Sequence, residues 1–181
     1  MRFDSSQPVS AEDIINHSSE SELAELIWRY GEDRDSRRIA RVIVQNRPLH
    51  STLELAVAIK KAIRHRPGSI HPATKTFQAL RIVVNHELDS LERFLPQAIQ
   101  SLVSGGRLAV ISFHSLEDRI VKQYFRYESR DCVCPPDQPV CNCGHHASLT
   151  EITRRPITAD PDEVATNIRA RSAKLRVAEK K

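Results

Sequence analysis

The feature that most constrains the fold is one change of apolar periodicity late in the chain. Through the first two-thirds, apolar side chains recur every three or four residues, the spacing of a helix face. Residues 107–113, RLAVISF, then form a short apolar run with two β-branched residues. Such a run predicts a buried central strand of a parallel sheet. A helix-rich chain with a strand of this kind is predicted to be α/β.

Local signals predict the helix boundaries. Three Ser–acid pairs have the spacing of a capping box: Ser10 with Asp13, Ser19 with Glu22, and Ser51 with Glu54. Gly31 and Pro48 predict the ends of two helices, the second with its arginines outward. A third helix is predicted at 52–64 and a loop at 65–72. From Ala73 to Leu95 the apolar steps predict one long helix or two, and Pro96 predicts a bend or restart.

The C-terminal third mixes helices and strands. A helix is predicted at 116–127, with Ser115 as N-cap and Asp118 completing a capping box. Asp160 starts a further helix, and residues 172–178 read as a closing strand. Two strands do not make a stable open sheet. The neighbours of strand 107–113 are therefore expected in sequence that is not present here.

Composition excludes several classes of protein. With 181 residues and 40% hydrophobic content the chain is predicted to fold, and no apolar run approaches the roughly 18 residues of a membrane helix. A polar N-terminus makes a cytoplasmic location the expectation. The net charge of +4 fits a nucleic-acid partner, although many soluble proteins share it. Only five glycines occur, and none forms the glycine-rich turn of a nucleotide-cofactor domain.

Four ordered segments carry a family resemblance. They are YGE with RRIAR at 30–41, HPATKTFQALRI at 71–82, GGRLAVISFHSLEDRIVKQYFR at 105–126, and NIRARSAKLR at 167–176. Together they resemble the ribosomal RNA small subunit methyltransferase H family, also called MraW. Members begin with a Rossmann-like half that binds S-adenosylmethionine through a glycine-rich turn. That half is expected to be absent here, which would leave the chain inactive alone.

The resemblance implies a domain organisation and a reaction. Residues 1–86 would be a helical insert that recognises RNA, and residues 87–181 the C-terminal part of a Rossmann-like class I methyltransferase sheet. The reaction would be S-adenosylmethionine-dependent methylation of the exocyclic N4 of a cytosine in the decoding region of 16S rRNA, in the small ribosomal subunit. The alternative is a small, basic, zinc-stapled RNA-binding module without catalysis.

Two groups of residues are candidates for this chemistry. Those near the reacting base lie at the C-terminal end of strand 107–113, where open α/β sheets place ligands: Ser112, His114, Ser115, Glu117 and Asp118. A strand-to-helix capping network alone would also explain them. The candidates for RNA contact are basic or lie at a loop–helix junction: His71, Thr74, Lys75, Arg81, Arg169, Arg171, Lys174 and Arg176. The other interpretation is that the histidine is buried and the charged side chains are simply solvated.

All four cysteines lie in a segment expected to be irregular, residues 131–146. Cys132, Cys134, Cys141 and Cys143 form two C-x-C pairs. Four thiolates can close a tetrahedral structural zinc site, and clustered cytosolic thiols favour metal. Free or redox-active thiols and disulfides are the alternatives.

Overall fold

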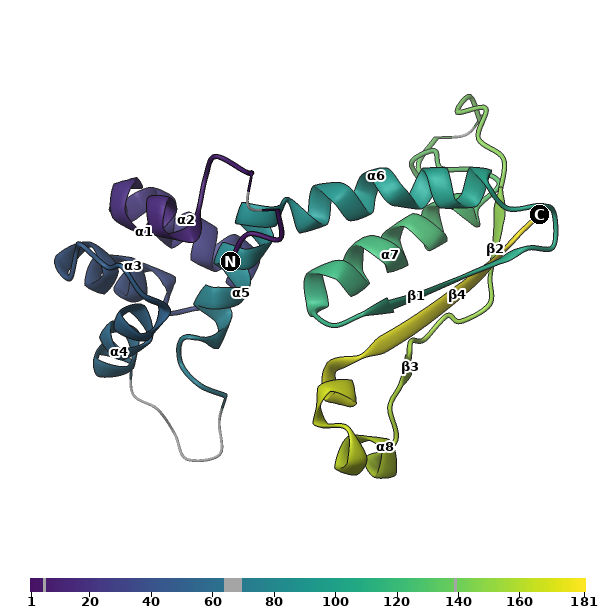
Figure 1. The fold of residues 1–181 in the computed structure, drawn as a ribbon. Helices are drawn as coiled ribbons and strands as arrows, with labels where there is room; N and C mark the ends of the chain where they lie inside the picture. Colours follow the sequence, from purple (N-terminus) through teal and green to yellow (C-terminus); the bar gives the residue numbers. More distant parts are fainter. Residues whose placement is uncertain (5, 64–69, 139) are drawn as a thin grey trace. The chain divides into compact units, whose positions relative to one another are not determined.

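The computed structural model describes residues 1–4, 6–63, 70–138 and 140–181, which divide into two compact units (Figure 1). Unit 1 is Met1–Glu87 and unit 2 is Leu88–Lys181. None of the described helices combines the length and the hydropathy that crossing a membrane requires.

Unit 1 is helical. Its helices are α1 (Ala11–His17), α2 (Glu20–Gly31), α3 (Ser36–Gln45), α4 (Thr52–Ala62) and α5 (Thr74–Asn85). Their apolar faces meet in one core, whose most buried large side chains are Leu23, Ile27, Ile39, Ile43, Leu55, Ile59 and Leu80. The arginines of α3 and the preceding turn are exposed, as the sequence predicts.

Side-chain caps begin most of these helices. The predicted capping boxes at Ser10 and Ser19 are both confirmed, with the acid at N3 bonding back to the cap. At α4 the box differs, because the Glu54 carboxylate accepts the N–H of His50 at 2.7 Å instead of that of Ser51. Residues 64–69 lie outside the described part of the chain, and with them the predicted end of this helix and most of the predicted loop.

The apolar stripe from Ala73 to Leu95 forms two helices, α5 and α6 (Glu87–Gln100). The break falls at His86, whose φ of 49° is left-handed. The predicted restart at Pro96 is wrong, since α6 continues through this residue. Pro96 removes one helix hydrogen bond, and Glu92, whose carbonyl would accept it, lies on the exposed side.

Unit 2 contains a small antiparallel sheet. Its strands are β1 (Arg107–Ser112), β2 (Leu149–Glu151), β3 (Ile157–Thr158) and β4 (Lys174–Lys180). The order is β1-β4-β2, and β3 also pairs with β4. The predicted closing strand is confirmed as β4. The prediction that strand 107–113 is parallel is wrong for the described residues, because β1 pairs antiparallel with β4.

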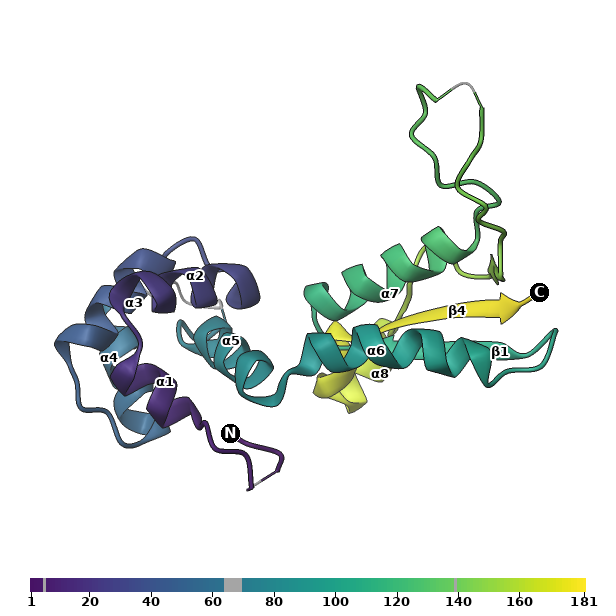
Figure 2. The same ribbon diagram turned by 90° about the horizontal axis from the view of Figure 1, so that it is seen from above.

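Helices cover one face of this sheet. α6 and α7 (Ser115–Glu128) lie over β1 and β4 (Figures 1 and 2). Leu108 and Val110 of β1 pack into the core between them, with Phe125 of α7 fully buried. On the other face Ile111 is 58% exposed, so the predicted burial of this strand on both faces is wrong within the described structure. Helices on one side bury only alternate residues of a strand.

The last connection of the chain is also helical. α8 (Pro161–Thr166) and a 3-10 turn (Ile168–Ser172) lie between β3 and β4. Asp160 caps α8 with Pro161 at its first position, which confirms that predicted helix start.

Candidate functional site

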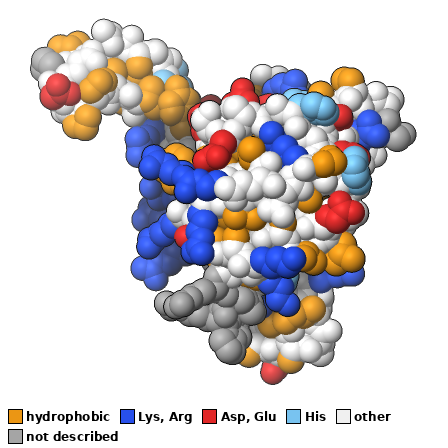
Figure 3. Space-filling model, turned by 90° about the vertical axis from the view of Figure 1, so that its left-hand side faces the viewer, with side chains coloured by type: hydrophobic (Ala, Val, Ile, Leu, Met, Phe, Trp, Pro, Cys, Tyr) orange, Lys and Arg blue, Asp and Glu red, His pale blue; other side chains and the backbone are white. Residues whose placement is uncertain are grey.

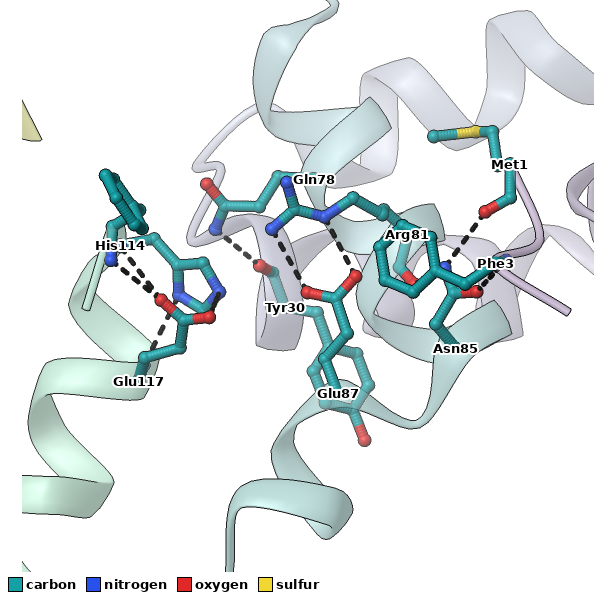
Figure 4. Close-up of polar contacts among 10 residues, drawn as sticks. Met1, Phe3, Tyr30, Gln78, Arg81, Asn85, Glu87, His114 and Glu117 are labelled. Carbon is teal, nitrogen blue, oxygen red and sulfur yellow. Dashed lines mark hydrogen bonds and ion pairs between the residues drawn. The ribbon is translucent and has the colours of Figure 1, made fainter. Parts of the chain in front are cut away.

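The turn after β1 is a capping network. His114 has extended backbone angles, and its Nδ1 accepts the N–H of Glu117 at 3.3 Å. Glu117 Oε2 in return accepts the N–H groups of Phe113 at 2.8 Å and His114 at 3.3 Å (Figure 4). The N-cap is therefore His114, and the prediction of Ser115 in this role is wrong, because the helix begins one residue earlier. Ser115 is the exposed first residue of α7.

Asp118 forms a buried salt bridge instead of the predicted cap. Its Oδ1 accepts from Arg176 Nε at 2.6 Å, and Lys174 Nζ lies 3.5 Å from Oδ2. Burial raises the pKa of Asp118, but the hydrogen bond and the charge of Arg176, with help from Lys174, outweigh it and hold the pKa below its usual value. Arg176 is only 3% exposed, so its predicted phosphate contact is wrong. The pair joins α7 to β4.

Ser112 is the last residue of β1 and faces the helical side of the sheet. It is 2% exposed, and its Oγ has no hydrogen-bond partner among the described residues. A buried hydroxyl without a partner carries a desolvation cost. The turn therefore brings Ser112, His114 and Glu117 together at one strand end, with Asp118 directed into the protein.

The structure gives two predicted RNA-contacting side chains of unit 1 internal partners. Lys75 donates to the carbonyl of Glu32 at 3.0 Å, just past the end of α2. Arg81 forms a two-pronged ion pair with Glu87, at 2.9 and 3.0 Å (Figure 4). His71 and Thr74 are exposed at the start of α5. In unit 2, Arg169 and Arg171 are exposed in the 3-10 turn.

Unit 1 also carries a hollow that the sequence interpretation missed. It lies between α2 and α3, has a volume of about 930 Å³, and is lined by Trp28, Arg34, Arg37 and Arg41 among others. Trp28 is 64% exposed although it is large and apolar. Trp28 does not lie on the face of α2 that Leu23 and Ile27 bury in the core. The spacing of these residues in the sequence already indicated that Trp28 would be exposed. We call this feature the α2/α3 hollow.

Basic side chains gather in several groups on one face of the molecule (Figure 3). In the α2/α3 hollow the three arginines face two acids, Glu20 and Glu25. Arg41 Nε lies 3.5 Å from Glu20 Oε1, and both side chains are well exposed. A solvent-exposed pair of this kind is weak, so Arg41 can exchange this partner for a phosphate.

The four cysteines converge, as a shared site requires. The ligand atoms of Cys132, Cys134, Cys141 and Cys143 all lie within 4.8 Å of one another. The segment that holds them projects from the sheet and helices of unit 2 between α7 and β2 (Figure 2).

One thiol of the group has a lowered pKa. The backbone N–H groups of Val133 and His145 lower the pKa of Cys143 to about 6.

Comparisons with known proteins agree across the whole chain. The family model described as the MraW methylase family matches residues 1–181. A ribosomal RNA small subunit methyltransferase H of Dehalococcoides mccartyi is 57% identical over 180 residues, covering 99% of this chain and 52% of the relative. Proteins of the same name from Heliobacterium mobile and Brevibacillus brevis are 51% and 52% identical, each covering 99% of this chain and 59% of the relative. The chain thus spans about half the length of the curated relatives it matches.

Proposed function

The chain belongs to the MraW methylase family, and from this premise we propose that it takes part in methylating ribosomal RNA of the small ribosomal subunit. The observation that carries the proposal is the family match, which runs through both units. The proposed target is the exocyclic N4 of a cytosine in the decoding region of 16S rRNA, with S-adenosylmethionine as methyl donor. Such a reaction takes place in the cytoplasm, where ribosomal subunits are assembled.

The chemistry of the target defines what the protein must provide. The N4 lone pair is delocalised into the cytosine ring, so the nitrogen must be held in line with the methyl group and must lose a proton. The base must also leave its stack. We assign base orientation to Ser112 and His114, because they lie at the carboxyl end of β1, where open α/β sheets place their ligands.

Glu117 and Asp118 are positioning residues in this proposal. Glu117 spends Oε2 on two backbone N–H groups and thereby holds Phe113 and His114 in place. Asp118 is neutralised by Arg176 and fixes the first turn of α7 against β4. Neither carboxylate is assigned to proton transfer.

The described residues do not by themselves fit the methyl donor. The turn after β1 runs through Phe113 and His114, and the chain has no glycine-rich strand-to-helix turn. Side chains at such positions keep the backbone from the close approach that a nucleotide-type cofactor requires. We therefore assign the residues of this chain to the RNA side of the reaction.

The α2/α3 hollow is the proposed main RNA contact. An exposed indole offers a stacking surface for an unpaired base, and the three arginines offer partners for phosphates. His71, Thr74, Arg169 and Arg171 are exposed and are proposed as additional contacts. Lys75 and Arg81 support the fold of unit 1 through their internal partners.

The test uses the natural gene product that contains this chain. It is expressed in a bacterium that lacks its own methyltransferase H gene, and methylated cytidine in 16S rRNA is measured by mass spectrometry of nuclease fragments. The expected result is that N4-methylcytidine returns at one position. A folded, abundant protein that leaves this cytidine unmodified would contradict the proposed function.

Variants of Trp28 test the RNA contact separately. Trp28→Ala is expected to weaken RNA binding about tenfold or more, because one base–aromatic stack contributes about 1–3 kcal/mol. Trp28→Phe keeps a stacking face and is expected to retain most of the affinity. Leu53→Ala, at another exposed apolar residue of unit 1, is the matched control. Equal affinity of Trp28→Ala and the wild type would refute this contact but not the reaction.

The other hypothesis, an RNA-binding module without catalysis, is not favoured. The relatives that cover this chain are named as methyltransferases. RNA binding by the chain is expected under both interpretations, so rRNA methylation is the measurement that separates them.

A further inference from the structure

The cysteine segment of unit 2 folds without a hydrophobic core of its own. None of the described residues from 130 to 147 is buried, and none belongs to the cores of the two units. Its base is closed by hydrogen bonds, from Ser148 N to Glu128 O at 2.9 Å and from Ala147 N to Asp131 Oδ1 at 3.3 Å. Yet its four thiols converge on one point. A segment of this kind needs another source of order.

We propose that Cys132, Cys134, Cys141 and Cys143 bind one zinc ion as a closed tetrahedral site with a structural role. The site shares no residue with the proposed RNA contacts or with the turn after β1. It does not depend on the methyltransferase function.

The sulfur positions match this geometry. Zinc–thiolate bonds of about 2.3 Å in a tetrahedron place the sulfurs about 3.8 Å apart. Four of the sulfur–sulfur distances are 3.4 Å (Cys132–Cys141), 3.6 Å (Cys141–Cys143), 3.9 Å (Cys134–Cys141) and 3.9 Å (Cys132–Cys143). Each thiol thus lies near the tetrahedral sulfur–sulfur distance from at least one other thiol, and all four sulfurs lie within 4.8 Å of one another.

The alternatives fit the geometry less well. A disulfide needs sulfurs about 2.05 Å apart, and all four cysteines are free. A histidine ligand is disfavoured, because the His145 ring packs on Tyr127 with centroids 4.7 Å apart and its Nε2 lies 3.2 Å from the Tyr127 carbonyl. His145 instead helps to close the base of the segment. Four sulfurs also complete the coordination shell of zinc, which leaves no open position for catalysis.

The first measurement is the metal content of the purified chain, produced with zinc in the medium. We expect one zinc per chain, and X-ray absorption is expected to show four sulfur neighbours at about 2.3 Å. Cys134→Ser combined with Cys141→Ser is expected to lose the metal. His146→Ala, a nearby residue outside the proposed ligand set, is expected to keep it.

A second measurement tests whether zinc orders the cysteine segment, and it does not rely on the variants. Removal of zinc with a chelator is expected to open residues 131–146 to proteolysis while the helical circular dichroism stays unchanged, since the segment contributes nothing to either core. A metal-free protein with four titratable thiols, an intramolecular disulfide found by mass spectrometry, iron in place of zinc, or a nitrogen ligand would each overturn the proposal. So would a segment equally resistant to protease with and without zinc.

Discussion

Asp118 shows how a single residue links α7 to β4. Its carboxylate lies against Arg176, fifty-eight positions later in the chain, and both side chains are almost entirely withdrawn from water. Removing one member of a buried pair leaves the other charged and unpaired, which costs more than the pair contributes when it is complete.

Asp118→Asn is therefore expected to lower the free energy of unfolding by about 3–5 kcal/mol at neutral pH. The folded pKa of Asp118 lies below its unfolded value of about 3.9, so its contribution is present above that pH and is lost as pH falls through the folded pKa. The difference between variant and wild type should shrink below about pH 4. Urea unfolding at several pH values measures this.

The control for this prediction is Asp131→Asn. The Asp131 side chain is 84% exposed, its ion-pair partner Lys181 lies at 4.0 Å, and asparagine keeps the Oδ1 that accepts the Ala147 N–H. A change of less than about 0.5 kcal/mol is expected there. A pH-independent gap between wild type and Asp118→Asn would contradict the role of the charge.

Gly31 is a second single residue that is expected to affect the stability of unit 1. A Cβ at this position would lie 2.7 Å from the carbonyl oxygen of Lys75 in α5. Alanine normally stabilises a helix by about 1 kcal/mol relative to glycine. Here Gly31→Ala is expected to destabilise unit 1 by about 1–3 kcal/mol, because α2 and α5 must move apart. Thermal denaturation, with exposed Ser21→Ala as control, measures it; a rise in Tm would refute the close approach.

At the scale of elements, the first turn of α7 both stabilises the helix and contains residues of the proposed site. The His114–Glu117 capping box resembles the Ser19–Glu22 box of α2 in its hydrogen bonds. The two boxes differ in place, since only the first lies at the end of β1. They form a natural pair for separating a structural role from a role in methylation.

Glu117→Ala and Glu22→Ala are each expected to lower stability by about 1 kcal/mol, as loss of a cap does. Only Glu117→Ala should also lower the methylation rate of the gene product that contains this chain, because Phe113 and His114 lose their anchor. Glu117→Gln keeps an acceptor and is expected to restore part of the rate. Full stability without activity in Glu117→Gln would show instead that the carboxylate itself contacts the substrate.

At the scale of the whole molecule, the proposed RNA binding is expected to depend on charge. A variant with Arg34, Arg37 and Arg41 all changed to Gln loses three proposed phosphate partners. For single-stranded RNA, the slope of the logarithm of affinity against the logarithm of salt concentration should fall by about 2 in magnitude. Lys60→Gln with Lys61→Gln, at exposed positions of α4, is the control and should change the slope little. An unchanged slope in the arginine variant would place the phosphates elsewhere.

The sequence by itself determined the features that rest on neighbouring residues. Helix starts at Ser10, Ser19 and Asp160 followed from side chains that reach an N–H three residues away. The family followed from four ordered segments, and the clustering of the cysteines from their short spacing. At the start of α7 the predicted N-cap was wrong by one residue, because a histidine nitrogen can cap a helix as a serine oxygen does.

Only the tertiary structure decided what depends on residues far apart in the chain. The direction and neighbour of β1 are set by β4, more than sixty residues later. The burial of Arg176, the exposure of Ile111 and the α2/α3 hollow depend on which face of an element another element covers. Local sequence patterns predict hydrogen bonds within one helical turn. Burial and ion pairing, in contrast, are determined when distant segments pack together. That packing buries Asp118 against Arg176 and leaves Trp28 exposed on the surface.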